Sequence, residues 1–293
     1  MNKTKIEWAT AVWNPVTGCT KVSEGCRNCY AEGIANRFWG ERKFTDIRCH
    51  EDRLNQPETW KKGQRIFVNS MSDLFHPDVP YDFIVDVFAV MNANRQHTFI
   101  VLTKRPDRYY QLVRGALMPI PNVWIGVSVE NQKAADERIP ILLQAQAAVR
   151  FVSCEPLLGR INFDIRQGSY ITRTLTGAYT TAAEPRFGNK LDWVIAGGES
   201  GRNARPMHPN WVRSIRDQCQ EANVPFFFKQ WGEWQLTDER EEMKQDGNER
   251  LTSIDVPGAI GYNKAWFRRV GKKNAGRVLD GRTWDEYPQE DEG

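Results

Sequence analysis

Short hydrophobic runs recur along the chain, and each is followed by a few polar residues and then by a longer amphipathic segment. The runs are apolar, β-branched or aromatic at nearly every position, which is typical of strands covered on both faces, as in a parallel sheet. A shorter run at residues 6–8 is a further candidate strand. The main runs occupy residues 65–69, 98–102, 123–127, 150–153, 192–196 and 224–228.

The segments between the runs have the spacing of helices. In residues 81–94, the apolar positions 83, 84, 87, 88 and 91 would lie on one helical face. Residues 107–117, 132–146 and 210–222 have a similar pattern. Alternating strands and helices predict an α/β fold with a parallel sheet. Six or seven such units favour a full or partial β/α barrel of the TIM type, and an open doubly wound sheet is the alternative.

Two segments interrupt this alternation. Residues 159–190 are rich in Thr, Gly, Ser and Arg and are interpreted as an insertion, either a functional loop or a mobile excursion. Residues 237–250 are highly charged and precede a basic, aromatic C-terminal segment. We therefore expect a barrel domain over residues 1–235, which includes the insertion, and a charged linker with a C-terminal extension over residues 236–293.

Composition and charge narrow the function classes only slightly. The chain has 293 residues, 40% of them hydrophobic, which is enough for one sizeable core. Its 40 basic and 37 acidic residues nearly cancel, so any surface that binds nucleic acid must be local. The first residues lack the apolar run of a signal peptide, and no segment approaches the ~20 apolar residues of a membrane span. We expect a soluble, cytoplasmic protein with no membrane partner.

Three of the six cysteines are clustered near the N-terminus. Six residues separate Cys19 from Cys26, and two separate Cys26 from Cys29. Thiols stay reduced in the cytoplasm, so this cluster indicates a metal or redox site rather than disulfides. A Cys-x-x-Cys turn directs two sulfur atoms at one metal centre, and Gly18 and Gly25 allow tight turns around it.

Three interpretations of the cysteine cluster are open. A structural zinc ion needs a fourth ligand, which Cys49 or His50 would provide. A redox-active Cys-x-x-Cys pair without metal is the second interpretation. The third, which we favour, is an iron–sulfur cluster. A cubane cluster has four irons, so three thiolates would leave one iron open to another ligand.

Polar residues follow almost every predicted strand. Active residues of β/α barrels lie at the C-terminal ends of the strands, so these positions are candidates for binding or catalysis. Loops are polar in any protein, and a structural ion pair or a tight turn is the alternative for each position. The candidates are Ser72, Asp73, Lys104, Ser128, Glu130, Cys154, Glu155, Gly197, Gly198 and Glu199.

Within this set, Lys104, Cys154 and Glu155 are the candidate catalytic residues. The ammonium group of Lys104 can bind a carboxylate or a phosphate. The thiol of Cys154, next to Glu155, can give a hydrogen atom to a substrate radical or bind a metal. The alternative is a buried cysteine that acts as a small hydrophobic side chain.

The C-terminal segment combines positive charge with aromatic rings. Positive side chains follow a phosphate backbone and aromatic faces stack on bases, so this segment is a candidate surface for a nucleic-acid partner. The alternative is a terminal segment that packs its aromatic rings on the barrel. The residues concerned are Lys264, Trp266, Phe267, Arg268, Arg269, Lys272, Lys273, Arg277, Arg282 and Trp284.

Residues 18–32, with three cysteines followed by Tyr30, resemble the cluster loop of the radical S-adenosylmethionine (SAM) superfamily. The chain as a whole is similar to an uncharacterised group of phage and bacterial radical-SAM-like proteins defined by a three-cysteine motif. The first spacer is longer than is usual in the superfamily, and Asn28 stands where an aromatic residue usually precedes the third cysteine. The further motifs of this resemblance are at residues 69–75, 102–106, 126–130, 154–157, 197–201 and 228–232.

The resemblance implies a β/α barrel that carries a four-iron, four-sulfur (4Fe-4S) cluster on the three cysteines and uses SAM as cofactor. Reductive cleavage of SAM would begin radical chemistry, with a reductant protein as partner and nucleic-acid modification or repair as the hypothesised reaction. The alternatives are a nucleic-acid-binding protein with structural zinc, or an iron–sulfur protein without SAM chemistry. By the resemblance, Tyr30 contacts the adenine, Ser72 or Asp73 the methionine ammonium group, Ser128 or Glu130 the ribose, and Gly197, Gly198 and Glu199 other parts of the cofactor.

Overall fold

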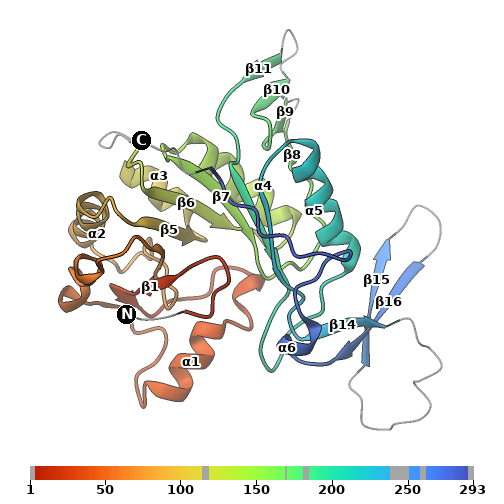
Figure 1. Cartoon of the computed structure of the whole chain (residues 1–293), viewed down its shortest axis with the longest axis horizontal. Coiled ribbons are helices and arrows are strands. Elements are labelled where there is room, and N and C mark those ends of the chain that lie inside the picture. The colour runs from red at the N-terminus through yellow and green to blue at the C-terminus, as the bar shows by residue number, and fades with distance from the viewer. Residues whose placement is uncertain are drawn as a thin grey trace.

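The computed structural model describes residues 4–113, 119–168, 170–180, 185–237, 251–257 and 262–289. At its centre is a seven-stranded parallel sheet in the order β1-β4-β5-β6-β7-β12-β13. The sheet curls into a half-barrel with helices around its outside (Figure 1). The predicted α/β fold with a partial barrel of parallel strands is confirmed. Its strands are β1 (Ala11–Trp13), β4 (Arg65–Val68), β5 (Thr98–Thr103), β6 (Val123–Ser128), β7 (Val149–Cys154), β12 (Trp193–Gly197) and β13 (Phe226–Gln230).

The first strand differs from its prediction. Residues 6–8 form no strand, and the chain enters the sheet only at Ala11. The apolar character of residues 6–8 has another cause, because Trp8 is 2% exposed and packs inside the half-barrel against Phe67, with 4.8 Å between the ring centroids. A short apolar run therefore marks burial here and not strand pairing.

Helices cover the outer face of the sheet (Figure 1). The helices expected at residues 81–94, 132–146 and 210–222 are confirmed within two residues at each end, while the end of the helix expected at residues 107–117 lies outside the described residues. The helices are α1 (Tyr30–Phe38), α2 (Tyr81–Ala93), α3 (Pro106–Val113), α4 (Gln132–Gln144), α5 (Pro209–Glu221) and α6 (Lys272–Ala275), with short 3₁₀ helices η1 (Glu24–Cys26), η2 (Glu51–Arg53) and η3 (Gln56–Thr59).

The inner face of the half-barrel carries a layer of large aromatic side chains. Alternate residues of each strand point inward, and Trp193 lies 5.6 Å from Phe151 and 5.8 Å from Trp124 between ring centroids. Trp8 and Phe67 belong to the same layer and also line the cavity described below. The aromatic layer is thus the floor of the functional site.

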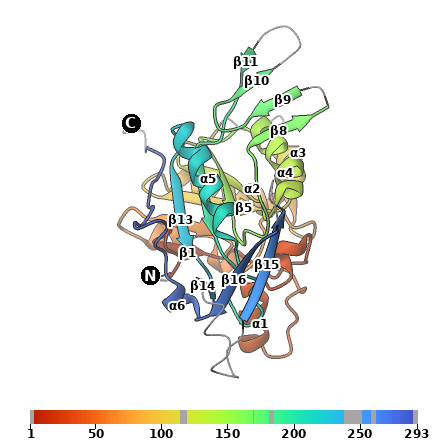
Figure 2. The ribbon, with the colours of Figure 1, turned by 90° about the vertical axis from the view of Figure 1, so that its right-hand side faces the viewer.

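The insertion folds into a small antiparallel sheet of its own. Figures 1 and 2 show this sheet at the opposite end of the molecule from α1. Residue 169 and residues 181–184 of the insertion lie outside the described part. Its strands are β8 (Asp164–Gln167), β9 (Tyr170–Arg173), β10 (Ala178–Thr180) and β11 (Pro185–Phe187).

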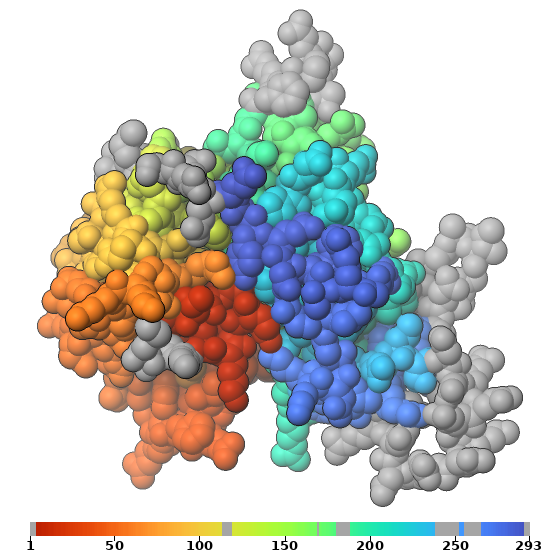
Figure 3. Space-filling model, viewed as in Figure 1, coloured from red at the N-terminus to blue at the C-terminus, as the bar shows by residue number. Residues whose placement is uncertain are grey.

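The C-terminal region begins with an antiparallel sheet of β14 (Trp234–Thr237), β16 (Tyr262–Arg269) and β15 (Leu251–Pro257), and residues 238–250 between β14 and β15 are not described. The chain then returns to the half-barrel, where Asp285 forms a β-bridge with Phe227 of β13. The segment also contacts residues near the start of the described chain, where Lys272 pairs with Glu7 over 3.2 Å and where red and blue surfaces lie side by side in Figure 3. No helix among the described residues is long and apolar enough to cross a membrane.

Candidate metal centre and cofactor cavity

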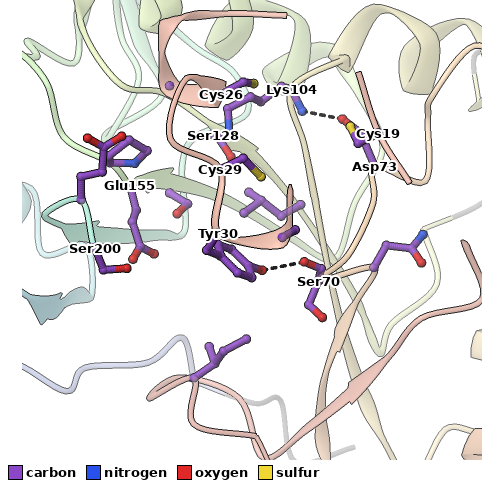
Figure 4. Close-up of a pocket in the computed structure, with 18 of the residues that line it drawn as sticks. Cys19, Cys26, Cys29, Tyr30, Ser70, Asp73, Lys104, Ser128, Glu155 and Ser200 are labelled. Carbon is purple, nitrogen blue, oxygen red and sulfur yellow. Dashed lines mark hydrogen bonds between the residues drawn. The ribbon is translucent and has the colours of Figure 1, made fainter. Parts of the chain in front are cut away.

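A cavity of about 370 Å³ lies at the C-terminal ends of the parallel strands. Cys19, Cys26 and Cys29 all line it, and Figure 4 shows them together on one side, with Glu155 and Ser200 on another. The structure therefore brings the cysteine loop and the polar strand ends, which are far apart in the sequence, to one place. The polar lining also includes Asn69, Ser70, Ser72, Asp73, Lys104, Ser128, Gly198, Glu199, Lys229 and Gln230.

The cysteine loop is tied to the end of β4. Gly18 donates its N–H to the Met71 carbonyl over 3.0 Å, and the Ser72 hydroxyl donates to the Gly18 carbonyl over 2.7 Å. Gly18 has φ +97°, and a Cβ there would lie 2.4 Å from the Asp46 carbonyl oxygen, so only glycine fits. The hydroxyl of Ser72, a predicted SAM contact, is thus used to hold the loop.

Asp73 and Arg105 form an ion pair directly behind Cys19. The Arg105 Nη1 lies 3.0 Å from Asp73 Oδ2 and 3.6 Å from the Cys19 sulfur. Burial raises the pKa of the Cys19 thiol and Asp73 adds to this, whereas the Arg105 guanidinium lowers it. Asp73 is only 6% exposed and accepts further hydrogen bonds from the protein, so its carboxylate has little capacity for a ligand.

Lys104 lies near Cys26, the last residue of η1. Burial alone would raise the pKa of the Cys26 thiol, but Lys104 and hydrogen bonds from Val22 and Ser23 lower it below the ordinary value. The Lys104 side chain therefore favours the thiolate, which is the form that binds metals. Cys29 follows as the N-cap residue of α1.

The Glu130 side chain packs against Gly25 of the cysteine loop. Its Oε2 lies 2.9 Å from Arg138 Nη1 on α4, and its carboxyl carbon would lie only 3.0 Å from a Cβ at Gly25. Burial raises the pKa of Glu130, yet Ser23 and Arg138 hold the pKa below its usual range. Glu130 is 2% exposed, and Ser128, which is also a predicted ribose contact, is the residue of this strand end that lines the cavity.

Glu199 plays a similar part on the other side of the loop. Arg205 donates to both of its carboxylate oxygens, over 2.6 and 2.9 Å, and Asn28 of the cysteine loop donates over 3.0 Å. Arg205 Nη2 also donates to the Glu24 carbonyl, over 3.0 Å. Burial raises the pKa of Glu199, but these bonds hold the pKa below its usual value. Asn28 thus connects the loop to the end of β12.

Glu155 and Lys229 face each other across the ends of β7 and β13. The Lys229 ammonium lies 2.8 and 2.9 Å from the two Glu155 oxygens, and Gln230 Nε2 donates to Oε1 over 3.2 Å. Both side chains retain some exposure, 20% for Glu155 and 12% for Lys229. This pair is a charged group within the cavity whose carboxylate is bound by a lysine and not by an arginine.

Gly198, unlike its neighbour Gly197, allows a close approach between protein backbones. A Cβ at Gly198 would lie 2.0 Å from the Trp231 carbonyl oxygen, and the Gly198 N–H donates to the Gln230 carbonyl over 2.9 Å. A Cβ at Gly197 would meet the Lys229 side chain at 3.4 Å. The need for glycine at 198 therefore arises from packing of β12 against the end of β13.

Cys154 lies on the outer side of the sheet and not in the cavity. Its side chain is fully buried in the core between sheet and helices, where burial raises the pKa of its thiol well above the usual range. Ser153, one residue earlier, lines the cavity instead. Successive side chains of a strand point to opposite faces, so the sequence-based placement of Cys154 at the cavity was wrong by one residue.

The remaining candidates lie at the rim or outside the cavity. Tyr30 is 50% exposed and donates its hydroxyl to the Ser70 carbonyl over 2.7 Å, as Figure 4 shows. Cys49 does not line the cavity. It lies in β3 (Arg48–Cys49), whose backbone pairs antiparallel with β2 (Val16–Thr17), with Cys49 opposite Val16. His50 bonds through Nε2 to the Thr17 hydroxyl over 2.8 Å.

Among the described residues, no three His, Cys, Asp or Glu side chains are close enough to hold a single metal ion. Structural zinc needs four ligands that converge on one ion at about 2.0–2.3 Å. In an iron–sulfur cluster each thiolate binds a different iron, so the ligands surround a volume and need not meet at a point. Three half-buried thiols around one cavity, with Lys104 and Arg105 beside them, fit a cluster by the chemistry of the donor set.

The sequence did not identify two of the arginines that complete the site. Arg138 and Arg205 carry no motif, and only folding brings them to Glu130 and Glu199. Arg105 stands in a recognised motif, but its contact with Cys19 depends on the neighbouring strand ends.

Comparisons with known proteins place the chain in a family without giving a reaction. No curated protein matches it. A solved structure titled "Spore photoproduct lyase complexed with dinucleoside spore photoproduct" is similar with 12% identity and a TM-score of 0.39, over 87% of this chain and 67% of that one. Nothing about the site follows from so distant a likeness. A family model matches residues 3–288, and the chain therefore belongs to the family described as "Protein of unknown function (DUF5131)".

Proposed function

We propose that the chain is an iron–sulfur enzyme of the radical-SAM type. The observation that carries the proposal is that Cys19, Cys26 and Cys29 line one cavity at the C-terminal end of the half-barrel. When bound, a cluster held by these three cysteines, together with SAM, would supply one-electron chemistry, with the electron coming from an external reductant.

The residues of the chain divide into two groups in this proposal. The three cysteines hold the cluster, and Ser72, Asp73, Glu130 and Glu199 keep the cysteine loop in place, since their polar atoms have protein partners. The residues left to contact cofactor or substrate are polar residues that line the cavity and do not hold the cysteine loop. We assign this role to Tyr30, Ser128, Glu155, Lys104 and Lys229.

The aromatic floor has a separate task. Trp8 and Phe67 close the interior below the cavity, so a radical formed above them would be shielded from water on that side. The Glu155–Lys229 pair offers both an acceptor and a donor to polar groups of a bound molecule.

Product analysis after anaerobic reconstitution with iron and sulfide tests the proposal. Dithionite and SAM are added, and 5′-deoxyadenosine is measured by liquid chromatography. We expect product from the wild type and none from Cys19→Ala, Cys26→Ala or Cys29→Ala. Cys49→Ala is the matched control and should retain the activity, because Cys49 does not line the cavity. No 5′-deoxyadenosine from a wild type that holds a full cluster would contradict the proposal.

The substrate is a separate proposal, for which nucleic acid is the candidate. The basic C-terminal segment supports it, although part of that charge has partners within the chain. Arg282 lies 3.4 Å from the ring centroid of Trp284, and Arg277 pairs with Asp285. The side chain of Lys264 is outside the described part. Binding of a single-stranded oligonucleotide that weakens steeply with salt would support this substrate, and no binding at low salt would contradict it.

A further inference from the structure

Arg105 is the described arginine whose guanidinium contacts a cysteine of the proposed cluster site. Its Nη1 lies 3.6 Å from the Cys19 sulfur, and its Nη2 donates to the Thr20 carbonyl and hydroxyl over 2.9 and 3.1 Å. The Arg105 side chain is only 11% exposed. A charged donor in such a dry position interacts strongly with whatever charge the sulfur carries.

The orientation of this guanidinium is fixed by several independent bonds. Asp73 accepts from Arg105 Nη1 over 3.0 Å, and the same carboxylate is held by the Thr103 hydroxyl over 2.8 Å and by the Lys104 N–H over 3.0 Å. The Arg105 N–H in turn donates to the Thr103 hydroxyl over 2.8 Å. Arg105 therefore cannot swing away from Cys19 without breaking a network that joins the ends of β4 and β5.

We propose that Arg105 is a positioning residue that hydrogen-bonds the Cys19 sulfur and raises the reduction potential of the cluster. This inference rests on the proposed function, because it needs a cluster on Cys19. Reduction adds one electron, hence one negative charge, and a cationic N–H donor at a ligand sulfur stabilises that charge. Asp73 has the opposite charge and pairs with Arg105 over 3.0 Å, so removal of Arg105 would also leave the Asp73 charge uncompensated.

A redox titration of the reconstituted protein, followed by electron paramagnetic resonance (EPR), tests the inference. In Arg105→Gln we expect the ratio of reduced to oxidised cluster at a given potential to fall at least tenfold, which is a shift of about 59 mV to more negative values for one electron. Arg108→Gln is the matched control, because Arg108 lies three residues further along the chain, on α3, and donates to the Val79 carbonyl, away from the cysteines. Its potential should equal that of the wild type.

The outcomes separate this inference from the function it rests on. A wild type that takes up no iron refutes the proposed function itself. A wild type and an Arg105→Gln variant with equal iron content and equal potential leave the function standing and overturn the role of Arg105. If the glutamine variant holds no cluster, Arg105→Lys decides. Lysine keeps the positive charge but has no second nitrogen to donate to Thr20 as Arg105 Nη2 does, so we expect a smaller shift in the same direction, and an unchanged potential would overturn the inference.

Discussion

The buried ion pair of Glu130 and Arg138 allows a quantitative test of how the cavity wall is built. The two side chains are 2% and 7% exposed, and Arg138 Nη1 also donates to the Ser128 carbonyl over 2.7 Å. The change Glu130→Gln preserves the shape of the side chain but removes its charge. Arg138 would then be a buried cation without a counter-ion.

Removal of one partner of a buried pair costs about 3–5 kcal/mol in free energy of unfolding, because the other charge stays desolvated. For a chain of this size about 1 kcal/mol lowers the melting temperature by roughly 2 °C, so Glu130→Gln should melt about 6–10 °C lower. The double change with Arg138→Met removes both charges and should recover most of this loss. Asp164→Asn is the matched control, since the Asp164–Arg173 pair is exposed and 3.8 Å long. Its effect should stay below about 1 kcal/mol.

The stability difference between wild type and Glu130→Gln should depend on pH, because the pKa of Glu130 is lowered in the folded state. Because Ser23 and Arg138 hold that pKa below its unfolded value of about 4.3, ionised Glu130 stabilises the folded state above this pH. The contribution is lost as the pH falls through the folded pKa. The stability gap between wild type and Glu130→Gln should therefore be largest near neutral pH and shrink below about pH 4.

Thermal unfolding of the apo protein, followed by circular dichroism in reducing buffer, measures these differences. The same variants are assayed for SAM binding after reconstitution. If Glu130→Gln keeps the wild-type melting temperature at neutral pH but loses SAM binding, the reasoning is refuted. Glu130 would then serve the ribose, as the sequence resemblance implies, and not Arg138.

Three other changes test separate parts of the structure. Gly198→Ala places a Cβ 2.0 Å from the Trp231 carbonyl oxygen and should lower the free energy of unfolding, measured by urea titration, by about 3 kcal/mol or more. Gly33→Ala is the control and should not lower it, because a Cβ at Gly33 has no atom within 4 Å. Equal effects of the two changes would contradict the packing described. Cys154→Ala should cost about 1 kcal/mol and leave the yield of 5′-deoxyadenosine unchanged, and a lost product would restore its catalytic role. Arg205→Ala removes the bonds from Arg205 to Glu199 and to the Glu24 carbonyl, so we expect faster proteolysis of the cysteine loop than in the control Arg202→Ala. Identical digestion rates would contradict the role of Arg205 in holding the loop.

The fold was largely predictable because its strands are buried on both faces. All six residues of β6 and all five of β12 are buried, which is why continuous apolar runs marked them in the sequence. Because both faces of these strands are buried, the sequence did not indicate which residues face the inside of the half-barrel. In β7 the hydrophobic pattern does not distinguish Ser153 from Cys154, because both faces are covered. The sequence therefore indicated where the strands lie, but not which of their residues face the cavity.

The candidate site was predictable in position but not in its internal contacts. Strand ends and cysteines could be placed together from the barrel pattern alone, since parallel strands end on the same side. The arginine partners could not, because Arg138 is on a helix and Arg205 is in a loop, and neither position has a sequence signal. The insertion was interpreted as a functional loop or a mobile excursion and its strands were not predicted, although β-branched Ile171 and Thr172 suit the strand that they form.

The most direct test of the central claim is the EPR spectrum of the reduced, reconstituted protein with and without SAM. The account predicts about four irons per chain and a cluster signal that changes shape when SAM is added, because three thiolates leave one iron open. A variant with Cys19, Cys26 and Cys29 all replaced by Ala should show no signal. Stoichiometric zinc in place of iron, or a cluster signal that SAM does not alter, would contradict it.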